Sequence, residues 1–160
     1  MELKRMDVLR EHLAKSLKGG QAFVSYKKAL EGVKPELRNV RPSPQLHSVY
    51  EELEHMRIAQ QDLLYYALEP VWESPEWPDG FWPKPGITVT DEIWSKTLNG
   101  FMDDLGKAVK LVEDEDIDIC SEIPGSEYTY LREITIIIEH NAYHLGKILD
   151  IRKALHNWER

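Results

Sequence analysis

The chain has 160 residues, of which 28 are acidic and 20 are basic, and its formal net charge is −8. This acidic balance argues against nucleic acid as a main partner, because binding to phosphates needs a basic face. The one cysteine, Cys120, excludes an internal disulfide and a zinc site built on cysteine pairs. We expect one domain over residues 1–160, long enough to bury a sizeable core.

Helical periodicity of the apolar residues predicts four long amphipathic helices and one short helix. Ser43 before Pro44 is typical of a helix start, since serine caps the first turn and proline fits within it. Pro70 ends that helix, and the next one is expected to start near Thr88 or Thr90. Because no alternating strand pattern competes, the fold class is all-α, a four-helix bundle. The long helices are expected at about residues 2–18, 44–69, 88–114 and 127–157, and the short helix at about 21–32.

An unusual loop is predicted over residues 70–87. Prolines punctuate it and argue against regular secondary structure. It also carries Trp72, Trp77 and Trp82, and disordered segments rarely contain so many aromatic residues. We therefore expect a packed loop. It could line a substrate pocket, or it could be a structural lid that seals one end of the bundle, and we favour the lid.

The N-terminal segment lacks the apolar stretch of a signal peptide. In addition, no apolar run approaches the roughly 18 residues of a membrane-spanning helix. These observations predict a soluble, cytoplasmic protein without a membrane partner.

The most informative local pattern is the pair His140 and His144 in the last predicted helix. A spacing of four residues places both rings on one helical face, one turn apart, where they can share a divalent metal ion. Asn141 stands where the H-E-x-x-H motif of zinc proteases has glutamate, so no general base lies between them. The alternative is two histidines at the core edge, although an unpaired polar ring in so apolar a helix is costly.

A third ligand has to come from another helix, and His55 is the best candidate. His47 is its rival, but eight residues separate the two, more than two helical turns, so both could not easily bind one ion. A histidine held at the edge of the core is the alternative interpretation of His55. His12 and His156 are expected at the surface.

Three segments of the chain resemble the DinB-like (DinB/YfiT) superfamily. They are residues 46–60 (LHSVYEELEHMRIAQ), residues 74–83 (SPEWPDGFWP) and residues 139–147 (EHNAYHLGK). Together with the glycine pair at 19–20 and the linker at 35–38, the resemblance covers nearly the whole chain. It implies a four-helix bundle that holds a divalent metal through three histidines, which here are His55, His140 and His144.

Three imidazole ligands suit zinc, nickel, iron or copper without sharp discrimination, and we expect zinc or nickel, with iron as a further choice. They leave coordination positions for water, as catalytic rather than structural zinc sites do. Each imidazole also needs a hydrogen-bond acceptor for its other nitrogen, and Glu51, Glu52 and Glu133 are candidates. The sequence does not identify a catalytic acid or base.

The resemblance implies an enzyme that uses its metal to activate water or a low-molecular-weight thiol. The activity would be that of a hydrolase or a thiol transferase, acting on a small-molecule substrate in a detoxification or stress role. A non-catalytic bundle, braced by its metal and acting as a binding or regulatory module, is the alternative. A homodimer is compatible with either.

Overall fold

The computed structural model describes residues 2–158, and side chains from residue 4 onward. Within that range the structure is helical, which confirms the predicted fold class, and its only strand-like pairing is one bridge between Glu122 and Thr129. None of its helices combines the length and apolar character needed to cross a membrane. The helices are α1 (Glu2–Lys18), α2 (Tyr26–Leu30), α3 (Val49–Leu68), α4 (Asp91–Glu113) and α5 (Tyr130–Ala154), with 3₁₀ turns η1 (Pro35–Leu37) and η2 (Asp79–Phe81).

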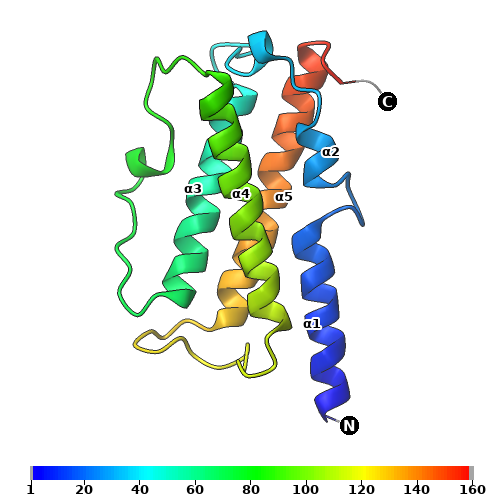
Figure 1. The fold of residues 1–160 in the computed structure, drawn as a ribbon, viewed down its shortest axis with the longest axis vertical. Helices are drawn as coiled ribbons and strands as arrows, with labels where there is room; N and C mark the ends of the chain where they lie inside the picture. Colours follow the sequence, from blue (N-terminus) through cyan, green and yellow to red (C-terminus); the bar gives the residue numbers. More distant parts are fainter. Residues whose placement is uncertain (1, 159–160) are drawn as a thin grey trace.

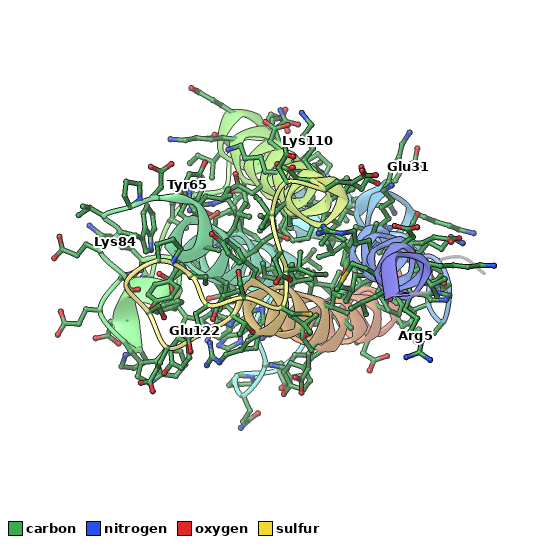
Figure 2. The ribbon with its side chains drawn as sticks, turned by 90° about the horizontal axis from the view of Figure 1, so that it is seen from below. Arg5, Glu31, Tyr65, Lys84, Lys110 and Glu122 are labelled. Carbon is green, nitrogen blue, oxygen red and sulfur yellow. The ribbon has the colours of Figure 1, made fainter. Side chains whose placement is uncertain are left out.

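The four long helices pack side by side as a bundle in which α3 and α4 run in the same direction and α1 and α5 run opposite to them (Figure 1). The parallel pair requires a long connection, because the chain must return along the full length of α3 before α4 begins. Residues 69–90 make this return on the outer side of α3 (Figure 1). Seen from below, Lys84 in this loop and Arg5 of α1 lie at opposite sides of the bundle (Figure 2).

The loop therefore runs along the side of the bundle, and the predicted lid over one end is wrong. Its packing, in contrast, is as expected: the indole of Trp72 donates to Asp62 at 2.8 Å and stacks on Tyr65. The expectation of no regular structure also needs one correction, because η2 is a short helical turn. It forms on the non-proline residues Asp79–Phe81, which keep the N–H groups that such a turn needs.

Helix α3 begins at Val49, five residues later than predicted from Ser43 and Pro44. Ser48 accepts a hydrogen bond from the backbone N–H of Glu51, and the Glu51 side chain accepts one from the Ser48 N–H. This capping box satisfies two donors that a helix start otherwise leaves unpaired. The start of α3 is therefore set by the serine-x-x-glutamate pattern of Ser48 and Glu51, and not by the serine–proline pair.

The other helix boundaries are closer to the predictions. Helix α2 covers only Tyr26–Leu30 of the expected 21–32, since Ser25 caps it. Thr90 and Thr129 cap α4 and α5, and each accepts a hydrogen bond from the backbone N–H three residues ahead. Helix α5 consequently starts three residues after the expected position 127.

The core lies between α3, α4 and α5, with α1 packed against α4 and α5. One polar link crosses it: Gln60 of α3 donates to the Phe101 carbonyl of α4 at 2.8 Å and accepts from Asn141 of α5 at 2.7 Å. Because all three residues are fully buried, this link fixes how the helices align along their axes. Gln60 lies five residues after His55, and Asn141 directly follows His140, so the link joins the two helices that carry the predicted metal ligands.

Candidate metal centre

The three predicted histidines come together between α3 and α5. His55 projects from α3, and His140 and His144 project from successive turns of α5. One ring nitrogen from each residue lies within 4.8 Å of the other two, an arrangement that could hold a metal ion. The Nε2 atoms of His55 and His140 are 3.1 Å apart.

The loop outside α3 fixes the ring of His55. Its Nδ1 lies 2.7 Å from the carbonyl oxygen of Phe81. Because a carbonyl only accepts, Nδ1 carries the proton, and Nε2 is left with the lone pair of a metal ligand. The indole of Trp82 covers one face of the same ring, with centroids 3.9 Å apart and planes 2° apart. The residues that position His55 are therefore distant from it in sequence.

Glu52 positions His144 in the same way. The His144 Nδ1 lies 2.5 Å from the Glu52 carboxylate, and both side chains are buried. An ionised carboxylate is an acceptor only, so Nδ1–H donates and Nε2 is the nitrogen left to bind a metal. This is the carboxylate–histidine arrangement that orients ligands in many zinc sites. Of the three predicted acceptors, Glu52 is the one that contacts a cluster histidine.

His140 completes the cluster, and its Nδ1 is buried with no hydrogen-bond partner among residues 2–158. Burial, together with the neighbouring His144 and His55 rings, lowers the pKa of His140 to about 4. Burial also lowers the pKa of His55, although the hydrogen bond to Phe81 opposes the shift. Both rings are consequently neutral at pH 7, and only a neutral imidazole has a lone pair to offer a metal.

Glu52 is shared by three side chains. It accepts from His144 on one oxygen, and on the other from His47 at 2.9 Å and Lys147 at 3.3 Å. Burial alone would raise the pKa of Glu52, but the hydrogen bonds from His144 and His47 outweigh it and lower the pKa to about 2. The carboxylate is therefore ionised at neutral pH.

The other predicted acceptors serve elsewhere. Glu51 caps α3 and pairs with Arg41. Its side chain points in a different direction from that of Glu52, because neighbouring residues of a helix are rotated by about 100° about the helix axis. Glu133 pairs with its neighbour Arg132. Glu133 lies seven residues before His140, which is about 10 Å along the helix axis and beyond hydrogen-bonding reach.

His47 is not part of the cluster, yet it belongs to its surroundings in a way that sequence reasoning missed. It precedes the helix cap, so helical spacing does not place it. Its ring packs on Trp82, with centroids 4.1 Å apart, and bonds Glu52. Contacts with Trp82 and Glu52 thus connect it to two of the histidines. His12 and His156 are exposed, as expected, and Cys120 is exposed as well.

Comparison with known families identifies a matching family. The model of a family described as the DinB superfamily matches residues 21–148, which include α2 to α5 except for the end of α5. Comparisons with curated proteins and with solved structures gave no significant match. The matched region contains the whole histidine cluster and the loop that contacts it.

Proposed function

The chain belongs to the DinB superfamily, and on this basis we propose that it is a divalent-metal-dependent enzyme with His55, His140 and His144 as ligands. It would act on a small-molecule substrate and activate water or a low-molecular-weight thiol, as a hydrolase or a thiol transferase. One observation carries the proposal. Two of the three clustered rings have their Nδ1–H bound by protein acceptors, which directs the lone pair of Nε2 to the ligand position.

The donor set fits a divalent ion. Nitrogen ligands about 2.0–2.1 Å from a tetrahedral zinc ion lie about 3.3 Å from one another. The 3.1 Å between the Nε2 atoms of His55 and His140 is close to that separation. Without an ion, two nitrogen atoms at this distance need a proton between them. Imidazole ligands suit zinc, nickel and iron alike, and we propose zinc or nickel as the ion.

A divalent ion bound here would lower the pKa of coordinated water or of a coordinated thiol, and so supply a nucleophile at neutral pH. The chain's own residues would set the conditions for this chemistry. Glu52 and the Phe81 carbonyl orient two ligands and make them more electron-rich. Trp82 covers one face of His55 and keeps water from that side. Three protein ligands leave at least one position for the nucleophile.

The first test is metal content, measured by elemental analysis of untagged protein. We expect about one ion per chain in the wild type, and its loss in His144→Ala and in His55→Ala. His12→Ala is the matched control, since His12 is exposed on α1, and it should keep the metal. The proposal fails if the wild type contains little metal even after incubation with zinc, nickel and iron salts.

A second measurement separates an open catalytic site from a structural brace. In the cobalt-substituted protein, the visible absorption reports the ligands of the metal. An open site predicts that a small thiol such as cysteine or 2-mercaptoethanol, or the anion azide, changes this spectrum at one equivalent of cobalt. A closed, structural site predicts an unchanged spectrum with all three additives and a large loss of thermal stability on chelation.

A further inference from the structure

Four buried side-chain atoms have no hydrogen-bond partner in the part of the chain that the structure describes. Two of them belong to consecutive residues of α5: Nδ1 of His140 and Oδ1 of Asn141. An unpaired polar atom in the interior is costly, so native proteins keep such atoms for a reason. Because one of the two belongs to a predicted metal ligand, the reason is sought in the metal centre.

The orientation of the Asn141 amide is fixed by its neighbours. The side-chain nitrogen of Gln60 donates to the Phe101 carbonyl, which leaves the Gln60 oxygen as an acceptor. Asn141 must therefore present its nitrogen to Gln60, at 2.7 Å, and its oxygen Oδ1 is the atom left over. Because Asn141 is fully buried, bulk water does not supply the missing donor.

The position of the proton on the His140 ring follows in the same way. The Nε2 atoms of His55 and His140 are 3.1 Å apart, and without an ion one of them donates to the other. His55, whose pKa is lowered by burial, is neutral at pH 7 and already carries its proton on Nδ1, so the donor is His140. A neutral His140 then has a lone pair on Nδ1. Since this nitrogen and the Asn141 oxygen are both acceptors, they cannot bond each other.

The two side chains are nevertheless close together. His140 faces His55 and Asn141 faces Gln60, so both point towards α3. Burial and the neighbouring His144 and His55 rings lower the pKa of His140, and the Asn141 side chain opposes them as a hydrogen-bonding group. Asn141 is therefore within reach of the His140 ring once that ring has a proton on Nδ1 to donate.

A metal on Nε2 of His140 would create this condition. The ion excludes the proton from Nε2, and a neutral ring then carries its proton on Nδ1. We infer that Asn141 is the positioning residue of His140: in the metal-bound protein its Oδ1 accepts a hydrogen bond from His140 Nδ1–H. Nε2 gives up one proton and Nδ1 takes one up, so the ring stays neutral. The inference rests on the proposed function, since it needs a metal on His140.

This contact would complete the surroundings of the metal centre. All three ligand rings would then have an acceptor for their second nitrogen, as metal-binding histidines almost always do. The contact would also extend the buried polar link, which would run from His140 through Asn141 and Gln60 to the backbone of α4. Both unpaired atoms would be satisfied by the same proton.

Nuclear magnetic resonance of the wild type tests the inference, because the ¹⁵N shifts of an imidazole show which nitrogen carries the proton. In metal-free protein at pH 7, we expect His140 to be protonated on Nε2 and His55 on Nδ1. With one equivalent of zinc, the proton of His140 should be on Nδ1. The side-chain carbonyl ¹³C resonance of Asn141 should then move downfield, since its oxygen gains a donor. An unchanged Asn141 resonance, or zinc bound through Nδ1 of His140, would overturn the inference.

Two substitutions of Asn141 separate a role in metal binding from a role in packing. Asn141→Leu and Asn141→Asp both remove the amide group that donates to Gln60, so both disturb the buried link. Aspartate keeps an acceptor at the position of Oδ1, and leucine does not. We expect Asn141→Leu to bind zinc about tenfold more weakly than the wild type. Asn141→Asp should bind zinc at least as tightly as the wild type, because a carboxylate is the stronger acceptor.

Zinc affinity is measured by competition with a chromophoric chelator, and circular dichroism verifies that each variant is helical. Equal losses of affinity in the two variants would mean that Asn141 acts through packing, and would overturn the inference. If neither variant folds, the ¹³C resonance of Asn141 in the wild type decides. If zinc binds equally to the wild type and to Asn141→Leu, only this inference fails. If zinc does not bind to the wild type, the proposed function fails, and the inference fails with it.

Discussion

Replacement of Glu52 by glutamine tests whether this carboxylate strengthens metal binding through its hydrogen bond with His144. The substitution keeps the size of the side chain and removes its charge. The bond from His144 Nδ1 at 2.5 Å is then no longer charge-assisted. In addition, the new amide group brings a donor towards a site where His144, His47 and Lys147 all donate, so one of them loses its acceptor.

The size of the effect follows from these contacts. A hydrogen bond to a charged group contributes about 1.5–3 kcal/mol, whereas one between neutral groups contributes about 0.5–1.5 kcal/mol. The difference of about 1–2 kcal/mol, at 1.4 kcal/mol per factor of ten, corresponds to about tenfold weaker metal binding. This is at the lower end of the 10–100-fold losses usual for such outer acceptors.

The assay is a competition titration of zinc between the protein and a chromophoric chelator at pH 7. Glu51→Gln is the matched control, because Glu51 is the preceding residue but contacts the cap of α3 and Arg41 rather than a histidine. Glu52→Gln should bind zinc about tenfold more weakly than the wild type, and Glu51→Gln should bind it equally well. Equal zinc affinity in all three proteins would refute the role assigned to Glu52.

Three further predictions concern stability. Burial raises the pKa of Tyr26 to about 12, so the folded state favours the neutral hydroxyl. The contribution of this preference to the free energy of unfolding is present below about pH 10, where tyrosine is also neutral in the unfolded chain, and it falls by about 1.4 kcal/mol by pH 11. Tyr26→Phe should remove this part of the alkaline loss in urea unfolding, and an unchanged slope would contradict it. Ser48→Ala removes the α3 cap and should lower the free energy of unfolding by about 1 kcal/mol, whereas an equally stable variant would argue against the capping box. Phe101→Ala leaves a cavity at a fully buried site and should lower the free energy of unfolding by about 3–5 kcal/mol, as measured by thermal unfolding. A loss of less than about 1 kcal/mol would mean that the core collapses into the cavity.

Much of the fold could be predicted from local patterns. Apolar residues at helical spacing predicted the four long helices, because that spacing is a property of the helix and does not depend on its neighbours. The start of α3 was misplaced for a local reason: two start signals lie five residues apart, and the capping box at Ser48 satisfies more backbone donors than Ser43 with Pro44. The predicted lid over one end of the bundle was also wrong for residues 69–90, since composition indicates that a loop packs but not the surface on which it packs.

For the site, the sequence by itself determined the pairing of His140 with His144, because four residues of helix place two rings one turn apart whatever surrounds them. It proposed His55 as their partner, with the family resemblance in support. Only the tertiary structure decided which glutamate orients His144, that Phe81 and Trp82 hold His55, and that His47 joins this network. These contacts join residues up to 92 positions apart. Their distances depend on how α3, α5 and the long loop pack, which local sequence patterns do not encode.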